Sequence, residues 1–115
     1  MLSSDPQIIS DLMVKKHQGS VEKWFEELVD RDDIYYNWKN WQVLDTGRYI
    51  RPDFVVKGQR KVIEVFENEH SPAEVAPRIY DYQRMGYLCL IVWEFDIVYN
   101  PCDVVEDVGR FIGRF

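Results

Sequence analysis

The residue types that could do chemistry gather in residues 51–70, "RPDFVVKGQRKVIEVFENEH". Side chains alternate across a strand, so Glu64 shares one face of "KVIEVFE" with Val62 and Phe66. A carboxylate in an apolar strand is costly unless a cation, a hydrogen-bond donor or a metal lies nearby. Strand pairing can bring Asp53 close to Glu64. Two carboxylates side by side repel each other, and a divalent cation would remove that repulsion.

The chemistry that suits such a pair is magnesium-assisted hydrolysis. Magnesium takes oxygen ligands, needs few of them from the protein and keeps waters for reaction. We expect Mg²⁺ on Asp53 and Glu64, with Mn²⁺ able to substitute. His70 follows the same strand and could act as a general base, because an unperturbed histidine has a pKa of about 6.5.

Each of these residues also has a purely structural interpretation. The Pro-Asp pair at residues 52–53 is common turn chemistry, and Glu64 could be paired with Arg51 or Lys61. The acids of residues 67–69 could belong to a solvated loop, and His70 could simply precede a helix start. The combination of a strand carboxylate, an upstream Asp and a downstream His favours the functional interpretation.

One helix is predicted to bring a further acid to this place. Residues 21–32 follow the i, i+3, i+4, i+7, i+8 pattern of an amphipathic helix, preceded by a break at Gly19 and an N-cap at Ser20. Glu22 falls at the border of the apolar face, whereas Glu26 and Glu27 lie further round. Glu22 is therefore expected to point along the edge of the core.

The remaining patterns predict strands and helices around that hairpin. Residues 7–16 are weakly amphipathic, and residues 34–38 and 41–47 indicate early strands. The aromatic run 34–41 favours core and sheet edge over base stacking. Residues 49–56 and 61–67 predict an antiparallel hairpin across the loop 57–60, with Pro52 at a strand start.

A helix is expected to follow "SPAEV" and run to about Met85, where Gly86 can end it. The apolar run 87–95 is typical of a strand buried on both faces, and residues 104–112 predict a terminal helix. The strand-helix-strand step favours a parallel pair of neighbouring strands. The expected fold is α/β, or α+β, with a mixed sheet and helices on both sides.

Length and composition set the limits for the whole chain. Its 115 residues suit one domain, 1–115, and the pattern continuing to Phe115 is compatible with a piece of a longer protein. Fourteen basic and 20 acidic residues give a net charge of -6, which argues against gripping nucleic acid by bulk charge alone. With no apolar run of membrane length, we expect a soluble, intracellular, cytoplasmic protein that binds no membrane. Cys89 and Cys102 are predicted to be ordinary thiols.

The motifs "RPDFVV", "KVIEVFENEH" and "GYLCLIVWEFDI", in this order, resemble the very-short-patch repair endonucleases and related homing endonucleases. These belong to the PD-(D/E)xK nuclease superfamily, so the resemblance implies a restriction-endonuclease-like core. It covers about residues 22–97. The usual Glu-x-Lys is Glu64-Val65-Phe66 here, a departure shared by the branch that uses a His.

The resemblance implies a role for each candidate residue. Asp53 would be the principal metal ligand and Glu64 the second, His70 would activate the attacking water, and Glu22 would assist beside the site. The family's last acid corresponds to Asp81 or Glu74, and Asp81 is preferred because it lies nearer the end of its helix.

The predicted function is a magnesium-dependent DNA endonuclease, or the catalytic domain of a mobile-element or repair enzyme. Its partner would be DNA, with an additional DNA-binding domain or a dimer partner supplying recognition. The alternative is a nuclease-like fold that no longer cuts and serves as a binding or assembly module, which the missing lysine and the negative charge favour. Hydrolysis of a small substrate has less support, because no glycine-rich loop is visible.

Overall fold

A four-stranded mixed sheet in the order β1-β4-β5-β6 forms the centre of the computed structural model. The structure describes residues 19–37, 42–43 and 49–113, and the predicted helix at 7–16 lies outside them. The strands are β1 (Ile34–Tyr36), β4 (Phe54–Val56), β5 (Lys61–Phe66) and β6 (Leu88–Trp93). β1, β4 and β5 are antiparallel in turn, and β6 runs parallel to β5, as the strand-helix-strand pattern predicts.

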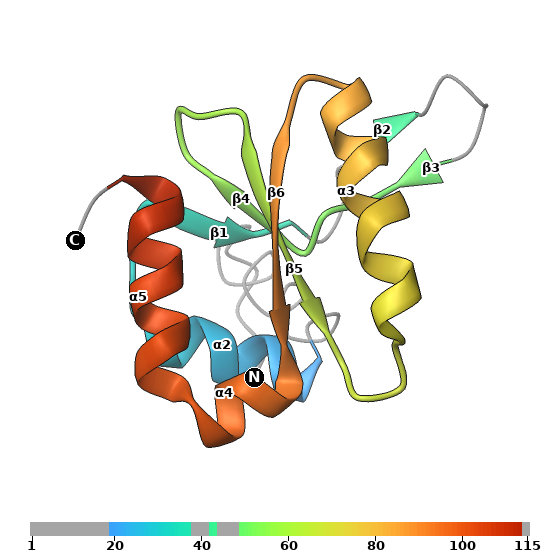
Figure 1. The fold of residues 1–115 in the computed structure, drawn as a ribbon. Helices are drawn as coiled ribbons and strands as arrows, with labels where there is room; N and C mark the ends of the chain where they lie inside the picture. The colour runs from blue at the N-terminus through green and yellow to red at the C-terminus, as the bar shows by residue number, and fades with distance from the viewer. Residues whose placement is uncertain (1–18, 38–41, 44–48, 114–115) are drawn as a thin grey trace, which may run out of the picture.

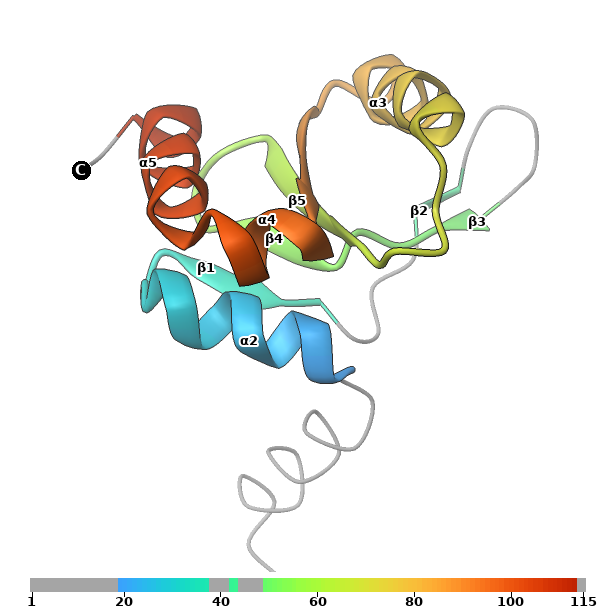
Figure 2. The same cartoon turned by 60° about the horizontal axis from the view of Figure 1, so that its bottom comes forward.

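Helices cover both faces of this sheet, which confirms the expected α+β architecture. Figure 1 shows α3 (Val75–Arg84) on one side, after a short 3-10 turn η1 (Pro72–Glu74). The helices α2 (Ser20–Val29), α4 (Glu94–Tyr99) and α5 (Pro101–Ile112) gather on the other side, and Figure 2 shows the same division from a second direction. No helix in the described residues is long and apolar enough to cross a membrane.

Two apolar clusters hold these layers together. The larger lies under α2, α4 and α5, where Phe25 packs on Phe54 with ring centroids 5.0 Å apart. The smaller lies under α3 and contains Ile50, Val62 and Tyr82. The spacing of apolar residues in α2 and α5 thus predicts both helices correctly, although α5 begins at Pro101, three residues before the predicted start.

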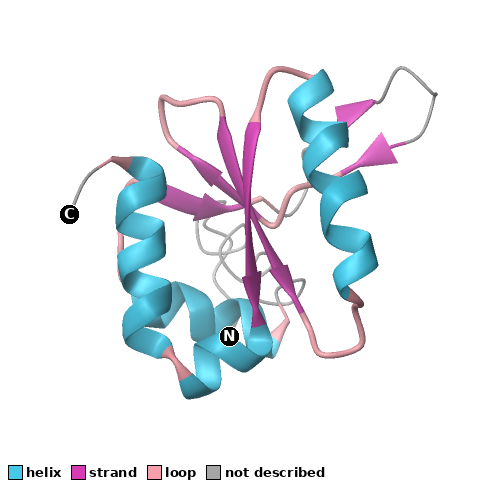
Figure 3. Cartoon of the chain, viewed as in Figure 1, coloured by secondary structure: helices cyan, strands magenta, loops and turns pink. Residues whose placement is uncertain are grey.

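The predicted single strand 49–56 is wrong, because it divides between two sheets. Tyr49–Ile50 (β3) pairs with Gln42–Val43 (β2) in a separate two-stranded sheet, and β4 starts only at Phe54 (Figure 3). Pro52 has no N–H for a ladder, so it marks the break instead of a strand start. The buried Asn37 satisfies two carbonyls at this break. Its backbone N–H donates to the Asp53 carbonyl at 2.8 Å, and its side-chain amide donates to the Pro52 carbonyl at 3.3 Å.

The predicted strand 87–95 also needs correction. It ends at Trp93, and Glu94 already begins α4. It is an edge strand in the described sheet and Leu88 is 52% exposed, so it is not buried on both faces. That description fits β5 instead, where five of the six residues are buried. An apolar run alone does not reveal which strand the chain order places in the middle.

Candidate functional site

The hairpin register sets Asp53 opposite Glu64. Phe54 pairs with Ile63 and Val55 with Val62, so the next position beyond the ladder brings Asp53 to Glu64. Asp53 leaves the ladder and accepts a hydrogen bond on Oδ2 from the Val65 N–H at 2.8 Å. The predicted closeness of the two carboxylates is confirmed, and their side chains are within hydrogen-bonding reach of each other.

Burial makes this pair electrostatically unfavourable when both groups are ionised. Glu64 is 5% exposed, and burial raises its pKa from the ordinary value. Burial first, and then the charge of Glu64, raises the pKa of Asp53 to about 7. Binding of a proton or a cation would relieve the repulsion between the two buried carboxylates.

Two residues of α3 that the sequence analysis did not single out stabilise Glu64. The Tyr82 hydroxyl donates a hydrogen bond to Glu64 Oε1, and Arg78 Nη1 lies 3.6 Å from the same oxygen. The expectation that Glu64 needs a donor or a cation is confirmed, but neither partner is one that we proposed. Lys61 instead donates to the Phe111 carbonyl at 2.6 Å. The i, i+4 spacing of Arg78 and Tyr82 on the helix following β5 is the signal that could have found them.

Glu22 lies beside the pair, as its place on the helix predicts. It is half-buried, its Oε2 accepts the Gly19 N–H at 3.1 Å, and Tyr36 hydrogen-bonds to it. Burial and then the charge of Asp53 raise the pKa of Glu22, which places the two carboxylates in one electrostatic environment. Burial also raises the pKa of Tyr36 to about 12, so this phenol stays protonated and can donate.

His70 lies apart from the carboxylate pair. Its ring stacks on Phe66 with centroids 4.5 Å apart, and its Nδ1 lies 3.3 Å from Glu74 Oε2. In the described part of the chain, no hydrogen bond or ion pair joins His70 to Asp53 or Glu64. The structure therefore brings Glu22, Asp53 and Glu64 together and pairs His70 with Glu74.

Both candidates for the last acid lie on the α3 side of the molecule. Glu74 and Asp81 line one recess between β3 and α3, together with Tyr49 and Arg78. Glu74 is the one that contacts His70, and this contact helps to lower the pKa of the Glu74 carboxyl after the larger effect of the Ser71 N–H.

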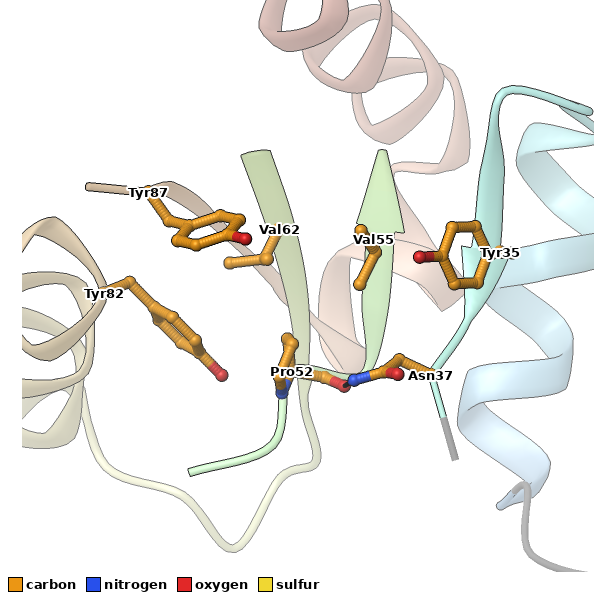
Figure 4. A pocket seen from close by; sticks show the side chains of 7 residues that line it. All are labelled: Tyr35, Asn37, Pro52, Val55, Val62, Tyr82 and Tyr87. Carbon is orange, nitrogen blue, oxygen red and sulfur yellow. Dashed lines mark hydrogen bonds between the residues drawn. The ribbon is translucent and has the colours of Figure 1, made fainter. Parts of the chain in front are cut away.

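A small cavity adjoins the pair without containing a reactive group of its own. It has a volume of about 100 Å³, and Figure 4 shows Tyr82 and Tyr87 on one side and Tyr35 and Asn37 on the other. Pro52, next to Asp53, lies between them.

Ile34 and Tyr36 are buried and Tyr35 is exposed, so the described part of the aromatic run supplies core and sheet edge.

Cys89 and Cys102 are both free thiols, as predicted. Burial raises the pKa of the Cys89 thiol, so it stays protonated.

The donor set fits a divalent cation that takes few protein ligands. The described residues hold no group of three or more His, Cys, Asp or Glu side chains arranged for a metal. The buried pair offers two carboxylates. The carboxyl groups of Asp53 and Glu64 would hold the cation, and each already accepts one hydrogen bond, on Asp53 Oδ2 and on Glu64 Oε1. Magnesium is commonly bound by one or two carboxylates plus waters and substrate phosphates.

Comparison with known proteins identifies no relative. No family model, no curated protein and no solved structure matches the chain. The case for a function therefore depends on the site.

Proposed function

We propose that this protein is a metal-dependent DNA endonuclease, or the catalytic domain of one, which hydrolyses phosphodiester bonds at Asp53 and Glu64. The observation that carries the proposal is the buried pair of carboxylates that the β4–β5 register sets opposite each other. Mg²⁺ is the expected ion, with Mn²⁺ as a substitute. When bound, it would supply positive charge for the phosphate and lower the pKa of the attacking water.

The chain's own residues would divide the remaining work. Asp53 and Glu64 would hold the ion, and Glu22 would accept hydrogen bonds from waters at the edge of the site. His70 would act as the base through Nε2, because the Glu74 carboxylate at Nδ1 favours the tautomer that carries its proton there. This role requires His70 to approach the substrate through a movement of the loop or through a bridging water.

The arrangement of elements supports the same proposal. The sequence resemblance leads us to expect a helix carrying an acid, a hairpin, a second helix and a last strand, and α2, β4–β5, α3 and β6 follow that order. We propose on this basis that the mixed sheet is a restriction-endonuclease-like core of the PD-(D/E)xK type. The His-using branch, which contains homing endonucleases, would account for the absence of a lysine after Glu64.

DNA is the proposed partner despite the net charge of -6. Arg51 and Arg78 supply local positive charge beside the pair, since Arg51 acts to lower the pKa of Asp53 and Arg78 that of Glu64. A separate DNA-binding domain or a dimer partner would supply most of the phosphate contacts. The cytoplasm is the compartment we propose for this activity.

A second candidate function is a nuclease-like fold that binds or assembles without cutting. Two observations favour it. Glu64 already has Tyr82 and Arg78 as partners, and His70 is paired with Glu74 away from the carboxylates. Such a module would retain its function in EDTA and in Glu64 or His70 variants.

Plasmid cleavage tests the proposed function. Supercoiled plasmid would be incubated with the wild type, Asp53→Asn and His70→Ala, each with Mg²⁺, Mn²⁺ or EDTA. We expect metal-dependent nicking by the wild type, and at least a 100-fold loss in both variants. Metal-dependent cleavage that survives Asp53→Asn would refute the assignment. Retained nicking by His70→Ala alone would remove His70 from the mechanism and leave the metal site standing.

A further inference from the structure

Arg78 occupies an unusual position between solvent and the carboxylate pair. It lies on α3, its Nη1 is 3.6 Å from Glu64 Oε1, and its side chain is 36% exposed. The Tyr82 hydroxyl donates a hydrogen bond to the same oxygen at a shorter distance, and the Tyr82 side chain is fully buried. Tyr82 is therefore the fixed partner of Glu64, and Arg78 is a looser, half-solvated one.

The electrostatic role of Arg78 would change when the pair takes a cation. In the metal-free protein the guanidinium offsets part of the Glu64 charge and acts to lower its pKa. A divalent cation held by Glu64 would supply that charge instead and would repel the guanidinium. The guanidinium would then need another anion as its partner.

A phosphate bound at the pair would lie within reach of Arg78. A cation held by Asp53 and Glu64 would also be able to bind a phosphate oxygen. The Glu64 carboxylate that would hold this cation is the one that Arg78 already faces at 3.6 Å. The planar guanidinium has donors suited to phosphate oxygens, and a change of rotamer would suffice to aim them.

From this geometry, and given the proposed nuclease function, we infer that Arg78 is the residue that binds the substrate phosphate next to the metal. It is held by Glu64 in the metal-free protein and released to the DNA backbone when the cation binds. The metal and the phosphate are thereby coupled through one side chain. The class of ligand is a phosphodiester oxygen of a DNA strand.

One acid of η1 and one of α3 offer the released arginine a competing partner. Glu74 and Asp81 share its recess, and Arg78 already contributes to lowering the pKa of Glu74. If either acid captured the guanidinium, Arg78 would contribute nothing to DNA affinity. DNA affinity therefore separates the inference from this purely structural role.

The test compares Arg78→Gln with Arg84→Gln as a matched control on the same helix, where Arg84 lies over the Tyr80 ring. Mn²⁺ affinity is measured by calorimetry without DNA. Affinity for a labelled duplex is measured by anisotropy in Ca²⁺ over a range of salt concentrations. We expect Arg78→Gln to bind Mn²⁺ about 3-fold to 10-fold more tightly, because a competing cation is gone, and DNA about 10-fold more weakly. Its salt slope, d log K/d log[salt], should fall by about 0.9 in magnitude.

The control variant should match the wild type within about twofold in Mn²⁺ affinity. The inference would be overturned if Arg78→Gln kept the DNA affinity and the salt slope of the wild type. If the wild-type protein in the same experiments bound Mn²⁺ and cut plasmid, the nuclease assignment would still stand. A wild type that binds no Mn²⁺ and cuts no DNA would overturn both. If Arg78→Gln fails to fold, Glu64→Gln is compared with Glu64→Gln/Arg78→Gln, in which removal of the guanidinium leaves no charged Glu64 without its partner. The same drop in salt slope is expected, and its absence would refute the inference.

Discussion

The carboxylate pair couples the protein's stability to pH. In the metal-free protein the pKa of Asp53 is raised to about 7, against an ordinary aspartate pKa near 3.8. The native state therefore keeps a proton that the unfolded chain loses between those values. Stability that this proton provides is fully present below about pH 4 and is lost as the pH rises through 7.

We predict that Asp53→Asn will stabilise the metal-free protein at pH 8. The neutral amide removes the repulsion with Glu64 and can still accept from the Val65 N–H, so a gain of about 1–2 kcal/mol is expected. Thermal unfolding between pH 4 and 8 in EDTA would measure it, with the exposed Glu69→Gln as control. The wild-type melting temperature should decline over this range and that of Asp53→Asn much less. Equal pH dependence in the two proteins would contradict the account.

Tyr82 is the residue whose hydroxyl matters most for Glu64. We predict that Tyr82→Phe will destabilise the protein by about 1–3 kcal/mol, because a buried carboxylate loses its closest donor. Urea unfolding at pH 7 would measure the change. Tyr80→Phe, on the exposed side of the same helix, should alter stability by less than about 0.5 kcal/mol. A neutral effect of Tyr82→Phe would show that Arg78 alone satisfies Glu64.

Individual site residues differ in how far the sequence predicts them. Asp53 and Glu64 could be predicted because strand alternation and a short hairpin determine their register. The partners of Glu64 could not, since they come from a helix whose rotation against the sheet depends on packing. His70 lies on a loop between β5 and η1, where sequence spacing alone does not determine the direction of the side chain.

At the level of elements, α2 connects the core to the site. Phe25 is fully buried against Phe54, one residue after Asp53, while Glu22 on the same helix reaches the carboxylates. We predict that Phe25→Ala will cost about 3–5 kcal/mol and will weaken Mn²⁺ binding through displacement of Glu22 and Asp53. Trp24→Ala, at a half-exposed neighbouring position, should cost far less. Chemical denaturation and calorimetry would compare the two, and equal losses would argue against this core as the support of the site.

Helices with a regular apolar period were predicted well. Strands whose ends or exposure depend on the segments packed beside them were not. The helices α2, α3 and α5 follow from period and capping, and Gly86, with φ of 84°, ends the α3 turn as predicted. The division of residues 49–56 between two sheets depends on Pro52 and on the distant Asn37. The exposure of β6 depends on strand order, which no single segment encodes.

For the whole molecule, the net charge of -6 means that the proposed nuclease would need a separate source of positive charge for DNA recognition. Burial and then Glu69 raise the pKa of Glu67, and the charges of Glu94 and Glu22 add to this rise. A cation on Asp53 and Glu64 would reduce the negative charge beside them, so that a phosphate strand can approach. Metal binding is therefore the step on which the proposed activity depends.

The most direct test of this account is a calorimetric titration of the protein with Mn²⁺ at pH 8. We predict one site in the wild type, a loss of affinity of at least 10-fold in Asp53→Asn, and unchanged binding in the control Glu69→Gln. No binding by the folded wild type, or equal binding by Asp53→Asn, would contradict the claim that Asp53 and Glu64 form a metal site.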